Sequence, residues 1–199
     1  RRTNVGAGRY RRRAALWAVA LIALAGATTA ARSCARPGVD TPATGAPTAG
    51  EPLQAGEISW IYDGDTFAVT AGDREEKVRL IGIDAPEADE RRGTVECFGH
   101  EATLYAIDRF KGEHATLELD PGQGDRDRYG RLLAYVWLDD GTLVNETLVA
   151  QGYAREYTYD EDYRYQDRIR AAERQARERD VGLWSPDTCD GEKTAPAGS

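Results

Sequence analysis

Lysine, histidine and cysteine are all scarce in this sequence of 199 residues, and each shortage narrows the chemistry available. The only lysines are Lys77, Lys111 and Lys193, so arginine carries nearly all of the positive charge. The two histidines, His100 and His114, stand in no ligand or acid–base motif, and we expect both at the surface or at a helix start. Arginine rather than lysine is therefore the expected source of positive charge in any site, and neither histidine is expected to act as a ligand or base.

Charge is unevenly distributed along the chain. The formal net charge is −8, from 34 acidic and 26 basic residues, yet residues 1–36 hold eight arginines and no acid. The remainder of the chain is therefore strongly acidic. Because affinity for nucleic acid comes largely from neutralising phosphates, such a chain needs a locally basic cleft or a bridging cation to act on nucleic acid.

Residues 1–34 are typical of a signal peptide or a membrane anchor. Six arginines in residues 1–13 precede residues 14–31, which carry no charge. The alternative, a buried core helix, is disfavoured by the basic flank. Cys34 is a weak candidate for lipid attachment, because an arginine stands two positions before it. We therefore expect a secreted protein, or one tethered to the extracellular face of a membrane.

The rest of the chain divides into a linker, a folded domain and a tail. Residues 35–56 are rich in Pro, Ala, Thr and Gly and lack apolar periodicity, which predicts a flexible linker. The folded domain is expected at residues 57–189, with a disordered tail at residues 190–199. This length accommodates one such domain, and we expect it to be a monomer.

Apolar alternation, turn dipeptides and helical periodicity predict five strands and three helices in the folded domain. The strands are expected at residues 58–62, 66–70, 77–83, 115–119 and 132–138, and the helices at residues 98–110, 144–151 and 160–179. Five strands with a helix between the third and the fourth fit an α+β, mainly β fold, namely a five-stranded OB-type Greek-key barrel with about three helices.

One strand end concentrates acidic and arginine side chains. An apolar run ends in a turn and carries Arg79, Asp84 and Glu87, while a preceding Asp-Gly-Asp-Thr turn supplies Asp65. Carboxylate oxygens suit Ca²⁺ or Mg²⁺, and a guanidinium group suits phosphate. A further carboxylate can orient or deprotonate a water. Each motif alone is more typical of an ordinary turn or salt bridge, but their combination predicts phosphodiester hydrolysis.

Several motifs in a fixed order resemble the staphylococcal-nuclease-like, or thermonuclease, family over roughly residues 58–184. The motifs are Asp63-Gly64-Asp65-Thr66, Arg79 through Glu87, Cys97 through Ala102, Asp127-Arg128-Tyr129-Gly130-Arg131, Leu143 through Glu146, Gln151-Gly152 and Gly182-Leu183-Trp184. The resemblance implies the OB-type barrel and a Ca²⁺-dependent nuclease. It further implies DNA and RNA as substrates, no sugar specificity, and products that end in a 3′-phosphate.

The resemblance also implies a role for each residue of the site. Asp65, Asp84 and the carbonyl of Ala85 would ligate Ca²⁺, with alanine standing where the family more often has threonine. Glu87 would hold the attacking water, either as general base or as positioner. Arg79 and Arg131 would grip the scissile phosphate and stabilise charge in the transition state.

Substrate contacts follow from the same resemblance. Arg128 and Tyr129 match positions that hold the neighbouring terminal phosphate. Tyr157 and Tyr159 match aromatic positions beside the nucleotide, where stacking tolerates any base. Ordinary packing is an equally good interpretation of these two tyrosines.

Two cysteines are candidates for a disulfide. Cys97 lies at the start of the first expected helix and Cys189 follows the last, and export would place both in an oxidising compartment. A bridge would close a long loop and stabilise the fold by roughly 4–5 kcal/mol in the chain-entropy model. Two unpaired thiols are the alternative.

A second function remains compatible with the same fold, namely a catalytically silent OB-fold module that binds nucleic acid on the cell surface. Such a module typically loses the acidic or the arginine residues of the site. All of them are present here, which favours the enzyme. A mere scaffold is disfavoured for a related reason, since a scaffold does not need to cluster like charges.

Overall fold

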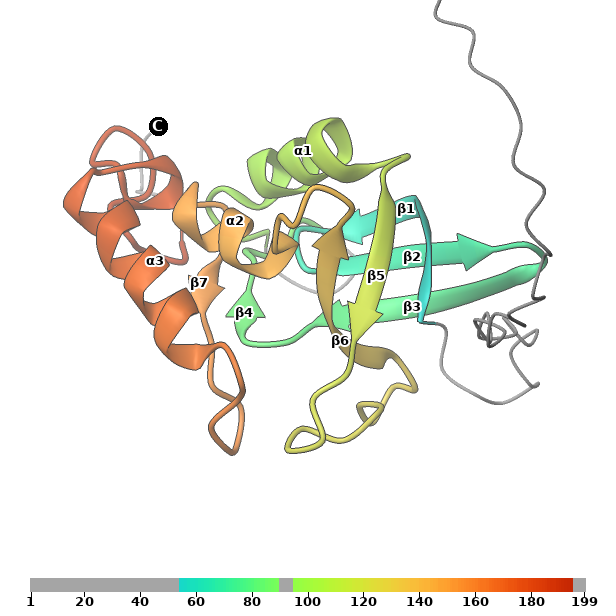
Figure 1. The fold of residues 1–199 in the computed structure, drawn as a ribbon. Coiled ribbons are helices and arrows are strands. Elements are labelled where there is room, and N and C mark those ends of the chain that lie inside the picture. Colours follow the sequence, from blue (N-terminus) through green and yellow to red (C-terminus); the bar gives the residue numbers. More distant parts are fainter. Residues whose placement is uncertain (1–53, 90–94, 195–199) are drawn as a thin grey trace, which may run out of the picture. The chain divides into compact units, whose positions relative to one another are not determined.

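The computed structural model describes residues 54–89 and 95–194, which form a β-barrel with helices packed around it (Figure 1). The barrel strands are β1 (Ala55–Asp63), β2 (Thr66–Ala71), β3 (Arg74–Leu80), β5 (His114–Glu118) and β6 (Leu132–Leu138). They close in the order β1-β2-β3-β6-β5, and every neighbouring pair is antiparallel except β3 and β6. The predicted five-stranded OB-type barrel is confirmed.

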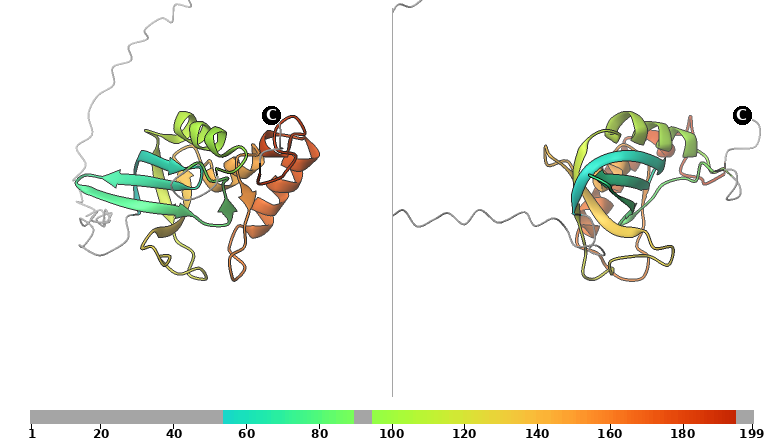
Figure 2. Two further views of the ribbon diagram at one scale, coloured as in Figure 1. Left: turned by 180° about the vertical axis from the view of Figure 1, so that it is seen from behind. Right: turned by 90° about the vertical axis from the view of Figure 1, so that its right-hand side faces the viewer.

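Three helices and a small second sheet surround the barrel. The helices are α1 (Gly99–Phe110), α2 (Val144–Ala150) and α3 (Gln166–Glu178), followed by a short 3₁₀ helix (Gly182–Trp184). The second sheet pairs β4 (Ile83–Asp84) with β7 (Arg155–Glu156). Figure 2 shows the barrel strands curving about a common axis with α1 lying across their outside, whereas α2 and α3 pack on each other beyond one end.

Helical periodicity explains how α1 meets the barrel. Ala102, Ala106 and Phe110 recur every four residues and are fully buried, so one stripe of the helix faces the strands. Phe110 reaches Phe67 of β2, with 6.3 Å between the ring centroids. The helix is thus packed against the barrel strands, and its own start lies beside the Glu87 loop.

The region after β3 differs from the prediction because Tyr163 is drawn into the core. The predicted strand at residues 77–83 is interrupted at Gly82, and the predicted helix at residues 160–179 begins only at Gln166. Tyr163 Oη donates to the Gly82 carbonyl at 3.1 Å. A side chain at Gly82, whose φ is +79°, would approach the Tyr163 ring to 2.4 Å, so this contact requires glycine.

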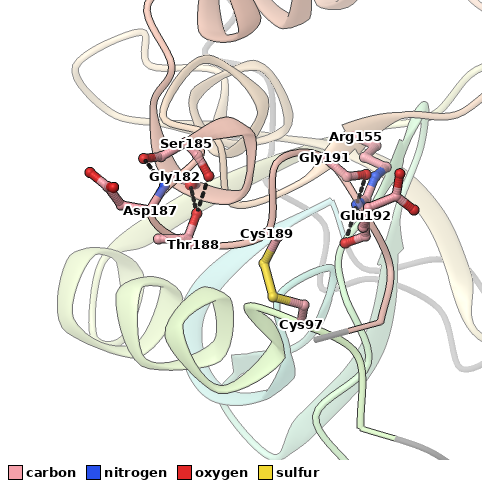
Figure 3. Close-up of a disulfide and its surroundings, with 9 residues drawn as sticks. All are labelled: Cys97, Arg155, Gly182, Ser185, Asp187, Thr188, Cys189, Gly191 and Glu192. Atoms are coloured by element: carbon pink, nitrogen blue, oxygen red, sulfur yellow. Dashed lines mark hydrogen bonds between the residues drawn. A yellow bond between two sulfur atoms is a disulfide. The ribbon is translucent and has the colours of Figure 1, made fainter. Parts of the chain in front are cut away.

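Residues 190–194, the described part of the segment expected as a disordered tail, contact the rest of the fold. Cys97 and Cys189 form a disulfide with an S–S distance of 2.04 Å, which holds the chain beside the start of α1 (Figure 3). Beyond it, Arg155 donates to the Gly191 carbonyl at 2.9 Å, and the amide of Cys97 donates to the Lys193 carbonyl at 2.9 Å. These long-range contacts fix a segment that carries no periodic pattern of its own.

Several predicted segments lie outside the described residues. They are the signal or anchor at residues 1–34, most of the linker at residues 35–56, and the end of the tail at residues 195–199. Among the helices of the described part, none combines the length and the apolar character needed to cross a membrane.

Candidate active site

Two carboxylates converge on one guanidinium group at the end of the barrel strands. Asp65 comes from the β1–β2 turn, Arg79 from β3 and Asp84 from β4. Arg79 Nη2 lies 3.1 Å from Asp65 Oδ2 and 3.8 Å from Asp84 Oδ1, and Nη1 donates to the Leu80 carbonyl at 2.7 Å. The register that pairs Thr66 with Arg79 brings these residues together. We call Asp65, Arg79 and Asp84 the inner wall.

Asp65 is a buried acid with several donors. Its Oδ2 accepts a hydrogen bond from the Ala85 amide at 2.9 Å, and its Oδ1 accepts one from Thr66 Oγ1 at 3.0 Å. Burial raises the pKa of the Asp65 carboxyl to about 6, although the charge of Arg79 opposes that shift. The ionised carboxylate would therefore gain from further positive charge.

The donor set of the inner wall fits a hard cation. Asp65 and Asp84 supply carboxylate oxygens, the ligands that Ca²⁺ prefers, and both already face one positive group. In the part of the chain that the structure describes, no three acidic, histidine or cysteine side chains are grouped to hold a metal by themselves. A cation here would need further oxygens, such as the Ala85 carbonyl, water and a phosphate.

Glu87 faces the same cavity as the inner wall. Its Oε1 accepts hydrogen bonds from the amides of Ala88 at 3.1 Å and Asp89 at 3.0 Å. A side chain at Gly99 would come within 2.3 Å of the Glu87 carbonyl, so α1 must begin with glycine to pack against this loop. Glu87, Asp65 and Arg79 line one cavity of about 780 Å³.

Arg131 is held in place by Asp127. Its Nε donates to Asp127 Oδ2 at 2.7 Å, and Asp127 Oδ1 accepts from the amides of Arg131 and Tyr129 at 3.0 and 2.9 Å. Burial disfavours ionisation of Asp127, but these hydrogen bonds outweigh it and lower the pKa of the carboxyl. Arg131 Nη1 also contacts Thr66 Oγ1 at 3.3 Å, so the guanidinium lies beside the Asp65 turn.

The predicted substrate residues lie on exposed loops. Arg128 Nη2 donates to Tyr129 Oη at 2.8 Å, and the Tyr157 and Tyr159 ring centroids are 6.2 Å apart. All four line a cavity of about 800 Å³ that also reaches Arg79. We call these four residues the outer wall. Tyr157 and Tyr159 are 46% and 67% exposed, so neither ring is packed into the core.

Lys193 reaches the inner wall, although the sequence places it in the expected disordered tail. Its Nζ lies 3.2 Å from Asp84 Oδ2 and 3.6 Å from Glu96 Oε1. The available signal is its position four residues after Cys189, because a disulfide to Cys97 brings the following residues back toward Glu96. Sequence reasoning also assigns no role to Asp127, because its contacts with Arg131 depend on the conformation of the loop.

Known proteins share clear sequence similarity with this chain. Residues 77–186 match the family described as staphylococcal nuclease homologue. The chain is 36% identical over 132 residues to a thermonuclease of Staphylococcus hyicus, an alignment that covers 66% of this chain and 76% of the relative. It is 33% identical over 127 residues to a thermonuclease of Staphylococcus intermedius, covering 64% and 74%. It is 36% identical over 124 residues to endonuclease YncB of Bacillus subtilis (strain 168), covering 62% and 58%. With this match and the barrel described above, the chain belongs to the staphylococcal nuclease homologue family.

Proposed function

We propose that this chain is a Ca²⁺-dependent, sugar-nonspecific nuclease that hydrolyses DNA and RNA and leaves 3′-phosphate ends. The observation that carries the proposal is the convergence of Asp65 and Asp84 on Arg79, with Arg131 beside the same turn. The similar proteins are named thermonuclease and endonuclease, which supports the same reaction class.

Arg79 and Arg131 are the groups proposed to bind the scissile phosphate. Both line the cavity that holds Glu87, and each is fixed by a carboxylate, Arg79 by Asp65 and Arg131 by Asp127. Donors held in place before the reaction need little reorganisation as charge develops on the phosphate oxygens, and each such donor is worth roughly 2–4 kcal/mol. Their fixed geometry makes them suited to the transition state.

Hydrolysis needs an attacking water, and Glu87 is proposed to orient it or to take its proton. The water oxygen would bond to phosphorus as the bond from phosphorus to the 5′ oxygen breaks. The 3′ side keeps the phosphate, and the 5′ oxygen leaves as a hydroxyl after taking a proton. Asp65, Asp84 and the Ala85 carbonyl are the groups proposed to hold Ca²⁺. When bound, that ion supplies neutralisation of phosphate charge.

The outer wall is proposed to hold the nucleotide beside the scissile bond. Arg128 and Tyr129 would bind the neighbouring phosphate, and the exposed rings of Tyr157 and Tyr159 would stack on bases. Every base has a π-face, so stacking gives affinity with little sequence preference. This arrangement supports low base specificity.

We propose that the protein acts as a monomer outside the cytoplasm, either released or tethered through its N-terminal segment. The Cys97–Cys189 disulfide supports the location outside the cytoplasm, because disulfides persist in oxidising compartments. Fractionation of expressing cells, with thiol alkylation of the recovered protein, provides the test. Recovery in the cytoplasm with two free thiols at these positions would contradict the proposal.

The function is tested by incubating the purified chain with single-stranded DNA, and separately RNA, in Ca²⁺. We expect cleavage that leaves 3′-phosphates, and we expect its loss in EDTA and in the Arg131→Ala variant. Circular dichroism of the variant checks that the fold is kept. Binding of both polymers without any cleavage would contradict the proposal and identify a silent nucleic-acid-binding module instead.

A further inference from the structure

Strand β1 leaves its regular register twice as it approaches the site. The shifts fall between Ile58 and Trp60 and between Ile61 and Asp63, so that two residues of β1 oppose one of β2 at each place. Side chains in a regular strand alternate between the two faces, and a bulge re-aims them. Here the bulges keep Ile58 and Ile61 inside the barrel while they turn Trp60 and Tyr62 toward solvent.

The two rings that these bulges present are large and open. Trp60 is 54% exposed and Tyr62 is 41% exposed, whereas Ile58 and Ile61 are 0% and 4% exposed. Isolated apolar residues at a surface are common and need no explanation. Two aromatic rings that stand two residues apart on one bulged strand form a more specific arrangement. Both face solvent, and they lie in line along the strand that leads to Asp63.

Each exposed ring carries a lysine. Lys111 Nζ lies 4.6 Å from the Trp60 ring centroid, and Lys77 Nζ lies 3.8 Å from that of Tyr62. These are two of the three lysines in an acidic chain. Their presence beside the two rings is therefore not explained by a generally basic surface. We call Trp60, Tyr62, Lys77 and Lys111 the aromatic–lysine strip.

The strip is continuous with the candidate active site. Lys77 lies on β3 and lines the cavity of about 780 Å³ together with Asp63, Arg79 and Glu87. In the sheet, Lys77 pairs with Ala68 of β2, and Ala68 pairs with Trp60 of β1. The strip therefore begins at the rim of the cavity on β3 and continues on β1, the two strands on either side of β2.

We propose that the aromatic–lysine strip binds single-stranded nucleic acid and extends the substrate path beyond the scissile phosphate. Bases would stack on Trp60 and Tyr62, and phosphates would approach the ammonium groups of Lys77 and Lys111. Exposed aromatic rings combined with cations are the arrangement by which proteins hold single strands without reading sequence. The inference rests on the proposed function for its substrate, and it adds a binding region outside the cavity lined by Tyr157 and Tyr159.

Fluorescence tests the strip without any turnover. The full chain in EDTA is titrated with a long oligothymidylate, and we expect the tryptophan fluorescence to be quenched on binding. In Trp60→Phe this quenching should be absent, whereas most of the affinity should be kept because a ring remains. The double variant Trp60→Ala/Tyr62→Ala should bind at least about tenfold more weakly, since each stacked base contributes substantially to affinity. Lys111→Gln should bind more weakly and with a shallower dependence on salt.

Kinetics with two substrate lengths separates the strip from the reaction itself. In Ca²⁺, the double variant should lose at least about tenfold in kcat/KM on the long oligonucleotide. It should keep the wild-type value on a dinucleotide, which we expect to occupy the cavity without reaching the two rings. Arg174→Gln removes one exposed cation from α3 and serves as the charge control, with no expected change on either substrate.

The outcomes distinguish failure of the strip from failure of the proposed function. Wild-type protein that cleaves neither substrate would overturn the nuclease, and the titration in EDTA would still decide whether the strip binds the strand. Equal affinity of wild type and double variant for the long oligonucleotide would overturn the strip. Equal losses on the long and the short substrate would overturn it as well, because they would place both rings in the reaction.

Discussion

The inner wall and the outer wall are built in opposite ways. The side chains of Asp65 and Arg79 in the inner wall are 10% and 17% exposed, and they bond to each other at the ends of barrel strands. Tyr129 and Tyr159 in the outer wall are 68% and 67% exposed and lie on loops. The difference shows that one surface holds its charges in fixed positions by burial, while the other presents aromatic rings to solvent.

Burial explains why the inner wall suits chemistry. Taking a carboxylate out of water is unfavourable unless it is paired and hydrogen-bonded. Arg79 and two donors stabilise Asp65, yet burial still raises its pKa to about 6. A wall that is held this firmly, and that still favours additional positive charge, is suited to a cation and a phosphate group that arrives with it.

The largest expected effect is on stability and comes from the disulfide, which also holds the tail against the inner wall. Replacing both Cys97 and Cys189 by serine removes a link between residues 92 positions apart. We expect the free energy of unfolding to fall by roughly 4–5 kcal/mol in the chain-entropy model, measured by urea denaturation. Wild-type protein measured in reductant is the control and should match the variant. Equal stability of variant and oxidised wild type would show that the bridge constrains nothing.

Removing Arg131, whose guanidinium lies beside the Asp65 turn, should lower the rate of turnover rather than the affinity for substrate. We expect Arg131→Ala to lower kcat by about 10²–10³-fold, as for loss of one preorganised donor, with KM changed only a few-fold. Steady-state kinetics on single-stranded DNA provides the measurement. Asp127→Asn keeps Arg131 but loosens the contact between Nε and Oδ2, so it should produce a smaller loss. A larger loss in Asp127→Asn than in Arg131→Ala would contradict the positioning role.

Removing a ring of the outer wall should lower the affinity for substrate rather than the rate of turnover. We expect Tyr157→Ala to weaken substrate binding by about 1–3 kcal/mol, the value of one stacked base, while kcat stays near that of wild type. Tyr157→Phe retains the ring and should behave like the wild type. If Phe and Ala weakened binding equally, the hydroxyl rather than the ring would be the contact, and stacking would be the wrong interpretation.

The smallest expected effect is on Ca²⁺ affinity and concerns Lys193, whose ammonium lies 3.2 Å from Asp84 of the inner wall. Removing a like charge near the proposed Ca²⁺ ligands should raise Ca²⁺ affinity, by about 1 kcal/mol for charges roughly 4 Å apart in water. Calorimetric titration of Lys193→Gln with Ca²⁺ provides the measurement. Lys111→Gln removes a lysine that contacts Trp60 and should leave Ca²⁺ affinity unchanged. Unchanged affinity in Lys193→Gln would show that this ammonium does not compete with the ion.

The barrel could be predicted from the sequence because each strand carries its own signal. β6 spans Leu132–Leu138, as the apolar run and its turn predict. The start of α3 could not be predicted, because Tyr163 leaves a helical pattern to meet Gly82, which is 81 positions away. The course of residues 190–194 depends on the disulfide and on hydrogen bonds across the fold, so no local pattern announces it.

The candidate site divides in the same way. Asp65, Arg79 and Asp84 fall in motifs, and the structure brings all three together. What the motifs lack is the support for these residues. The bond from Arg131 to Asp127 depends on a loop conformation. The contact of Lys193 with Asp84 depends on the path of the tail, which a linear pattern does not encode.

The most direct test of the division between the walls is single-turnover kinetics of Arg79→Ala and Tyr157→Ala on the same labelled oligonucleotide. Such kinetics report the rate constant of cleavage separately from the dissociation constant of the substrate. The account predicts that Arg79→Ala lowers the rate constant of cleavage and changes the dissociation constant by no more than a few-fold. Tyr157→Ala should raise the dissociation constant and leave the rate constant of cleavage near that of wild type. Loss of the same constant in both variants would contradict the division.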